Sequence, residues 1–140
     1  MHDFVRWLQE HDLKATFQRL SILAQIESAG HLDVDEIYAA VRTTHPTISL
    51  ATVYKNIVTM TDKGVLVEVP IAGHKSKYEI KKHEHVHLIC QRCGHVEDRD
   101  IDEILIRDTD EIARESAFAL HDRQVNLYGV CSACREDMAS

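Results

Sequence analysis

The sequence has little proline and no long apolar run. Two prolines among 140 residues, with 28% charged and 44% apolar residues, argue against a largely disordered chain. No stretch approaches the roughly 18 consecutive apolar residues that a transmembrane helix needs. The N-terminus lacks a basic segment followed by an apolar run, so we expect no signal peptide and a cytoplasmic protein without membrane contact. The chain is also too short for a barrel or a doubly wound enzyme fold.

Acidic residues outnumber basic residues, but only in the second part of the chain. The formal net charge is −7. Residues 1–82 carry ten Lys/Arg and ten Asp/Glu, whereas residues 83–140 carry six and thirteen. An acidic average argues against nucleic acid as a partner, but the asymmetry indicates two halves with different roles.

Residues 1–80 begin with a pattern of short helices. Helix N-caps are predicted at Thr16, Asp33 and Ser49, and Asp33 with Glu36 resembles a capping box. Two of these helices have apolar residues at helical spacing, and those of the later helix are expected to be buried. The apolar residues are Phe17, Leu20, Leu23 and Ile26 in the earlier helix, and Leu50, Val53, Ile57 and Met60 in the later one.

The last of these helices is followed by a predicted hairpin. Gly64 is expected to end the helix, and strands are expected over 65–69 and 77–80. Short helices followed by a two-stranded hairpin are typical of a winged helix-turn-helix. A generic helical bundle is the alternative.

The second half predicts a small α+β unit. Strands are expected over 85–90 and around Val96, a helix over 101–116, and a returning strand over 118–130. A core this small usually needs a metal, a disulfide or a partner subunit.

We therefore expect two domains joined by a hinge. The first is a winged-helix domain over 1–80, the hinge is the polar segment 81–84, and the second domain is the α+β unit over 85–140.

All four cysteines fall in two Cys-x-x-Cys motifs. Cys90 and Cys93 form the first, Cys131 and Cys134 the second, and 37 residues separate them. Four thiolates are the donor set of a tetrahedral structural zinc site. Such a site would hold the C-terminal strand against the first strand of the unit. The alternative is a set of buried or redox-active thiols, while disulfides are disfavoured in a reducing compartment.

A histidine motif precedes the first cysteine motif. His85 and His87 are two residues apart, so on a strand they face the same side and reach one ion. Their nitrogen donors, with carboxylate oxygens, suit iron, manganese or zinc. The candidate further ligands are His31, Glu79 and Asp98. The alternative is that the two histidines are ordinary solvated surface residues.

Five stretches of the chain, in this order, resemble the Fur family of metal-dependent bacterial transcription regulators. They are Leu13-Lys14-Ala15-Thr16 with Gln18-Arg19, residues 31–38, Ser49-Leu50-Ala51-Thr52-Val53-Tyr54-Lys55-Asn56, His85-Val86-His87-Leu88-Ile89-Cys90, and Tyr128-Gly129-Val130-Cys131. The resemblance spans nearly the whole chain. It implies an α+β fold, with an N-terminal winged helix-turn-helix domain and a small C-terminal α/β dimerisation domain that carries structural zinc.

The resemblance also implies roles for individual residues. Tyr54 matches a base-contacting tyrosine on the helix that enters the major groove, and Lys14 matches a basic residue that reaches the minor groove. The full predicted DNA-binding set is Lys14, Arg19, Thr52, Tyr54, Lys55, Asn56 and Lys75. The four cysteines match the structural Zn²⁺ site, and the implied regulatory site for Fe²⁺ or Mn²⁺ is His31, Glu79, His85, His87 and Asp98. A homodimer on double-stranded, palindromic operator DNA is implied.

One ligand position favours a subtype of the family. Asp98 stands where peroxide-sensing, PerR-type members carry Asp, whereas iron-sensing members usually carry Glu. The likeness implies that hydrogen peroxide reacts at bound Fe²⁺, that oxygen is inserted into His31 or His85, and that the repressor then leaves DNA. Two residues depart from the PerR pattern: Glu79 replaces an Asp, and Phe17 replaces a proline.

Other functions stay open at this point. The nearest is a repressor of iron-uptake genes that responds to ferrous iron. A zinc regulator is less favoured, because the second site has no spare thiolate. Two alternatives belong to other functional classes. One is a small non-haem iron enzyme, and the other is a zinc-stapled adaptor, which is a protein stabilised by zinc that does not bind DNA. The enzyme is disfavoured because the sequence offers no convincing substrate pocket and an enzyme would not need a winged helix.

Overall fold

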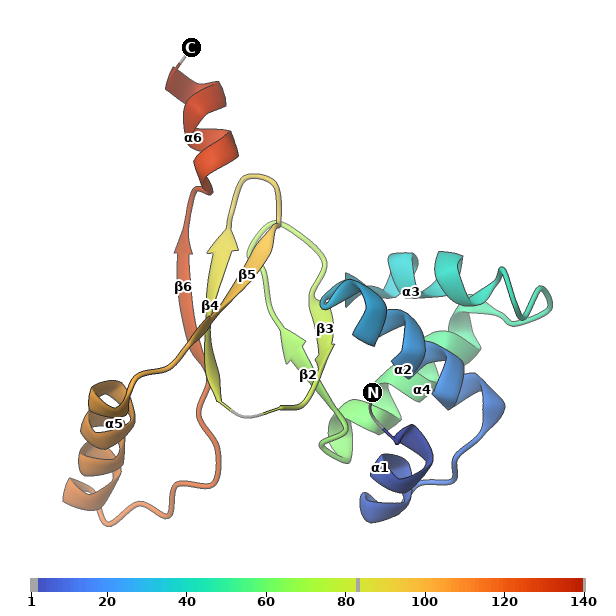
Figure 1. The fold of residues 1–140 in the computed structure, drawn as a ribbon, viewed down its shortest axis with the longest axis horizontal. Coiled ribbons are helices and arrows are strands. Elements are labelled where there is room, and N and C mark those ends of the chain that lie inside the picture. The colour runs from blue at the N-terminus through green and yellow to red at the C-terminus, as the bar shows by residue number, and fades with distance from the viewer. Residues whose placement is uncertain (1–2, 83, 140) are drawn as a thin grey trace. The chain divides into compact units, whose positions relative to one another are not determined.

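The computed structural model describes residues 3–82 and 84–139, and in it the chain divides into two units, Met1–Lys81 and Lys82–Ser140 (Figure 1). The segment expected to be a hinge contains His83, which lies outside the described residues. No helix in the described ranges is long and apolar enough to cross a membrane.

The first unit contains four helices, which begin at hydrogen-bonded N-caps. They are α1 (Phe4–Glu10), α2 (Phe17–Ala29), α3 (Val34–Val41) and α4 (Leu50–Asp62). The Thr16 and Ser49 hydroxyls accept hydrogen bonds from backbone N–H groups three residues later, and Asp33 forms a capping box with Glu36. The three N-caps predicted from the sequence are therefore confirmed.

A three-stranded antiparallel sheet completes the first unit. The strands β1 (Leu32–Asp33), β2 (Leu66–Val69) and β3 (Lys77–Ile80) lie in the order β1-β3-β2. Gly64 has a φ of +79°, which lets the chain turn from α4 into β2 without the steric cost that other residues have there. Helices α2 to α4 with this sheet form a winged helix, as predicted (Figure 1).

Leu50, expected to be buried, is exposed, and so is Phe17 of the earlier helix. Phe17 is 76% exposed and Leu50 is 43% exposed. Each is the first residue of its helix, and helical side chains point toward the N-terminus, which places these two beyond the packed turns. Ile22, Leu23 and Ile26 form the buried face of α2 instead.

The second unit is a sheet with β4 in the middle. Strand β5 (Val96–Asp100) pairs antiparallel with β4 (His85–Cys90), and β6 (Val125–Gly129) pairs parallel with it. Helix α5 (Glu103–Glu115) supplies the crossover that a parallel pair requires. Helix α6 (Ser132–Ala139) continues directly from the end of β6 (Figure 1).

Two expectations for this unit need correction, and one helix was missed. The strand expected over 118–130 is confined to β6, because only those residues pair with β4. The helix expected from residue 101 begins at Glu103, after an N-cap by Asp102. Helix α6 was not predicted, since its apolar spacing is weak and its start overlaps the second Cys-x-x-Cys motif.

The apolar cores of the two units differ in size. Thirteen buried residues form one cluster in the first unit. In the described part of the second unit, the buried apolar residues are Ile89, Cys90, Val96 and Ala113. A core this thin is marginal for a domain of this length, so further stabilisation must come from elsewhere.

Candidate functional site

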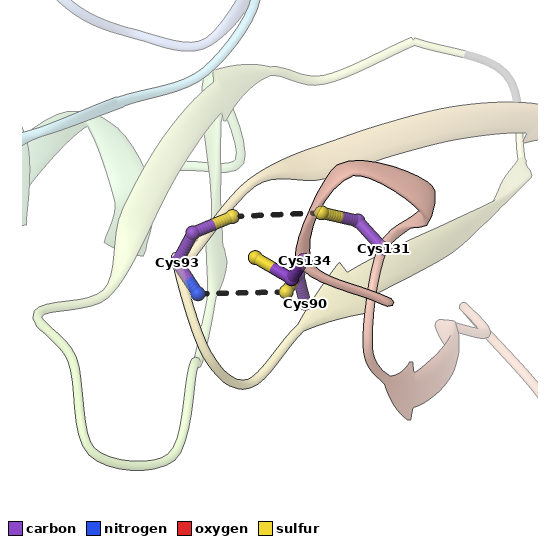
Figure 2. A group of neighbouring side chains, drawn as sticks. All are labelled: Cys90, Cys93, Cys131 and Cys134. Atoms are coloured by element: carbon purple, nitrogen blue, oxygen red, sulfur yellow. Dashed lines mark hydrogen bonds between the residues drawn. The ribbon is translucent and has the colours of Figure 1, made fainter. Parts of the chain in front are cut away.

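The four cysteines converge at one end of the second sheet. Cys90 ends β4, Cys93 lies in the turn before β5, Cys131 directly precedes α6, and Cys134 lies in its first turn. The four sulfur atoms all lie within 4.8 Å of one another, and those of Cys93 and Cys131 are 3.8 Å apart. Figure 2 shows the side chains directed toward a common centre.

This arrangement fits a tetrahedral zinc ion. Thiolates bound at about 2.3 Å to one zinc ion would lie about 3.8 Å apart. Backbone N–H groups of Cys131 and Cys93 lower the pKa of Cys90 to about 5. Hydrogen bonding to Cys131 raises the pKa of Cys134 to about 12. Four thiols this close cannot all ionise unless a cation compensates their charge, which Zn²⁺ would do.

The histidine motif lies on the central strand of the same sheet. His87 is buried, and it pairs with Asp98 on β5 in the antiparallel register. The Nε2 atoms of His85 and His87 are 2.8 Å apart, and Asp98 Oδ1 lies 3.5 Å and 3.6 Å from them. The interpretation of the two histidines as solvated surface residues is therefore wrong for His87. The three donors are spaced as ligand atoms of a single ion.

Two further polar residues, Asn126 and Lys82, contact the group formed by His85, His87 and Asp98. Asn126 Oδ1, on β6, lies 2.9 Å from His87 Nδ1. Lys82 donates a 2.7 Å hydrogen bond to Asp98 Oδ2, which leaves Oδ1 directed at the histidines. Sequence analysis missed both residues, because only the fold brings them to this group: Asn126 through the pairing of β6 with β4, and Lys82 from the segment before β4.

The other two predicted ligands belong to the first unit. His31 precedes β1 and Glu79 lies on β3, and β1 pairs with β3. His31 Nε2 is 2.7 Å from Glu79 Oε2, and the Glu79 side chain is only 3% exposed. The five predicted ligands thus fall into two groups, one in each unit.

Helix α4 presents part of the predicted DNA-binding set to solvent. Tyr54 is 54% exposed, Lys55 is exposed and Thr52 is partly exposed. Asn56 is used within the protein, because its Oδ1 accepts from Arg19 Nε at 3.1 Å and its Nδ2 donates to the Thr52 carbonyl at 3.0 Å.

The remaining predicted DNA-binding residues make contacts inside the first unit. Arg19 Nη1 donates to the Lys14 carbonyl at 3.0 Å, so Arg19 links the segment before α2 to α4. Lys75, in the turn of the β2–β3 hairpin, forms an ion pair with Asp35 of α3. The Asp35 carboxylate raises the pKa of Lys75.

Comparison with known proteins places this geometry in a family. The model of the Ferric uptake regulator family matches residues 10–128. The chain is similar to the peroxide-responsive repressor PerR of Staphylococcus saprophyticus, with 30% identity over 97% of this chain and 92% of the relative.

Among the solved structures that share the fold are two regulators. One is the Campylobacter jejuni peroxide stress regulator, with 33% identity, a TM-score of 0.78, and coverage of 95% of this chain and all of that one. The other is the Vibrio cholerae ferric uptake regulator, with 31% identity, a TM-score of 0.75, and coverage of 92% of this chain and all of that one.

These likenesses extend over both units, because the relative and the two solved structures cover 92–97% of the chain. They favour a regulator over the small iron enzyme and the zinc-stapled adaptor considered above. The chain belongs to the Ferric uptake regulator family, whose members are metal-responsive transcription regulators that bind operator DNA.

Proposed function

We propose that this chain is a repressor that binds operator DNA as a homodimer when Fe²⁺ or Mn²⁺ occupies a regulatory site, and that it responds to hydrogen peroxide. The observation that carries the proposal is the donor set on β4 and β5. Two imidazoles and one aspartate, without a thiolate, are ligands that suit iron and manganese. Similarity to relatives named as peroxide-responsive supports the same reading.

The regulatory ion would be bound by His31, Glu79, His85, His87 and Asp98. Supporting this, each unit holds one group of these residues in mutual hydrogen-bond contact. Neither group alone supplies a full ligand shell for an octahedral ion. An ion that needs both groups would restrict the units to one relative orientation, and its loss would release them. Structural Zn²⁺ on the four cysteines would be a separate, permanent site.

The homodimer would form through the second unit. Leu88 and Leu127 lie opposite each other on neighbouring strands, and their side chains are 36% and 53% exposed. Ile104 and Ile112 on α5 are 59% and 64% exposed. Apolar surface of this extent, over a thin core, is what a second copy of the chain would cover.

On DNA, we propose that α4 enters the major groove with Thr52, Tyr54 and Lys55 toward the bases and phosphates. Their exposure supports this assignment. Lys14 and Arg19 would contact the backbone or the minor groove. Because Asn56 and Lys75 are used in contacts within the protein, their contributions to DNA binding would be secondary.

The response to peroxide would be a covalent change in a ligand. When bound, Fe²⁺ supplies the electron that starts cleavage of the peroxide O–O bond. In the net reaction, one peroxide oxygen is inserted into a C–H bond of the His31 or His85 imidazole, and the other leaves as water. An oxidised imidazole is a poorer ligand, so the metal and then the operator would be released.

The test is to load the zinc-containing protein with Fe²⁺ in the absence of air and add about one equivalent of hydrogen peroxide. We expect a single added oxygen on the peptide that contains His31 or His85, together with loss of operator binding. The Mn²⁺-loaded protein is the matched control, and it should keep both its mass and its affinity for DNA.

The outcome separates the two repressor types. Unmodified peptides with retained operator binding would reject peroxide sensing and favour a repressor that responds only to ferrous iron. Modification of the Mn²⁺-loaded control would show that the oxidation does not depend on iron at this site.

A further inference from the structure

A buried histidine in the second unit is fixed by a residue that no sequence motif marks. Asn126 of β6 lies opposite His87 of β4 in the parallel register. Its Oδ1 is 2.9 Å from His87 Nδ1, and only 2% of His87 is exposed to solvent. The direction of this hydrogen bond determines which ring nitrogen of His87 carries the hydrogen.

The orientation of the Asn126 amide follows from its other contacts. Asn126 Nδ2 donates to Gln124 Oε1 at 3.2 Å and lies 3.4 Å from the Tyr128 hydroxyl. With the NH₂ group directed there, the oxygen faces His87, and the hydrogen-bond network assigns Nδ1 of His87 as the donor. In the neutral imidazole, Nε2 then keeps its lone pair.

The Nε2 atom of His87 is the one that faces the other donors. It lies 2.8 Å from His85 Nε2 and 3.6 Å from Asp98 Oδ1. We propose that Asn126 is a positioning residue that holds His87 in the Nδ1–H tautomer, so that Nε2 binds the regulatory metal. This inference rests on the proposed function, because it assumes that the metal occupies the histidine site.

Metal-bound histidines commonly donate their second ring N–H to an acceptor, and loss of that acceptor costs about 10–100-fold in metal affinity. An acceptor also fixes the ring plane, so Asn126 would reduce the rearrangement required on metal binding. The proposal predicts that metal affinity depends on the acceptor oxygen of Asn126 and does not depend on its amide NH₂ group.

Two variants separate these contributions. Asn126→Leu keeps the branching at Cγ and lacks the acceptor, whereas Asn126→Asp keeps an oxygen in the same place. The full-length, zinc-containing protein is used throughout. Zinc content and the far-UV circular dichroism spectrum establish that each variant is folded.

The first measurement uses protein without regulatory metal, so it does not depend on metal binding. Nitrogen-15 NMR of the imidazoles, with His87→Gln for assignment, should show the Nδ1–H tautomer in the wild type and in Asn126→Asp. Asn126→Leu should shift His87 toward the Nε2–H tautomer. An unchanged tautomer in folded Asn126→Leu would overturn the proposal.

The second measurement is a Mn²⁺ titration followed by the electron paramagnetic resonance of the free ion. We expect Asn126→Leu to bind Mn²⁺ about 10–100-fold more weakly, and Asn126→Asp to bind at least as tightly as the wild type. An equal loss of Mn²⁺ affinity in both variants would overturn the proposal, because only Asn126→Leu lacks the acceptor oxygen. If the wild type itself binds no Mn²⁺ beyond zinc, the proposed regulatory site fails, and the inference about metal binding fails with it.

Discussion

At the scale of single residues, the structure separates side chains that are available to DNA from those already bonded within the protein. Arg19 and Asn56 hydrogen-bond to each other across 37 positions of sequence. Sequence motifs identified both as DNA-binding candidates, because motif matching records residue types and not their contacts. Tyr54 and Lys55, on the same helix, are exposed. The distinction depends on tertiary packing, which a single sequence does not report.

Two lysines provide a direct test of this distinction. Lys55→Ala should weaken operator binding and reduce the slope of log affinity against log salt by about 1, because one phosphate contact is lost. Lys75→Ala should change the slope by much less, since Lys75 is already paired with Asp35. Fluorescence anisotropy with operator DNA at several salt concentrations measures both slopes. Equal losses for the two variants would contradict the assignment.

At the scale of helices and strands, helix N-caps could be predicted from the local sequence, whereas strand pairing could not. The N-caps at Thr16, Asp33 and Ser49 were predictable because a cap is recognised from neighbouring residues alone. Strand β1 has two residues and exists only because it pairs with β3, so its sequence gives no period. The limits of β6 are likewise set by β4.

Arg123 fixes the position of helix α5, and its contacts also escaped the sequence analysis. Its guanidinium lies 2.8 Å from Glu84 before β4 and 2.8 Å from Asp110 on α5, and it donates to the Ile106 carbonyl at 3.1 Å. These carboxylates raise the pKa of Arg123 above its ordinary value. One side chain thus connects three segments of the second unit.

Removal of this cation should loosen α5 before the rest of the unit. In Arg123→Met, amide hydrogen exchange within α5 should accelerate severalfold, while exchange in α3 of the first unit should be unchanged. The control is Arg107→Met on the same helix, because Arg107 is 70% exposed and contacts only its neighbour Asp108 among the ion pairs of the described residues. Equal acceleration in the two variants would show that the contacts of Arg123 are unimportant.

At the scale of the whole molecule, the sequence predicted two halves from their charge, their metal motifs and their family resemblance. The structure adds the difference in their cores, with a well-packed first unit and a second unit whose apolar residues are largely exposed. Apolar periodicity cannot distinguish a face that packs inside one chain from a face that packs against another chain. The exposure of Leu88 and Leu127 was therefore not predictable from their pattern.

The proposed dimer can be tested on this exposed face. Leu127→Asp would place a charge within the apolar surface and should convert the dimer to a monomer in sedimentation equilibrium, with operator affinity falling as the second half-site is lost. Glu27→Gln on α2 of the first unit, which is also exposed, is the control and should remain dimeric. A wild-type chain that sediments as a monomer at micromolar concentration would reject the dimer.

The parallel pairing of β4 with β6 connects the two candidate metal centres. In this register Cys90 lies opposite Gly129, two residues before Cys131, and His87 lies opposite Asn126. A zinc ion bound by Cys90 and Cys131 would therefore hold the strand alignment on which the contact between His87 and Asn126 depends. A slip of one residue would turn Asn126 to the other face of the sheet. Under the proposed function, oxidation of the thiols would then impair metal binding by the histidines as well, so that prolonged oxidative stress would abolish the response to metal even when iron is plentiful.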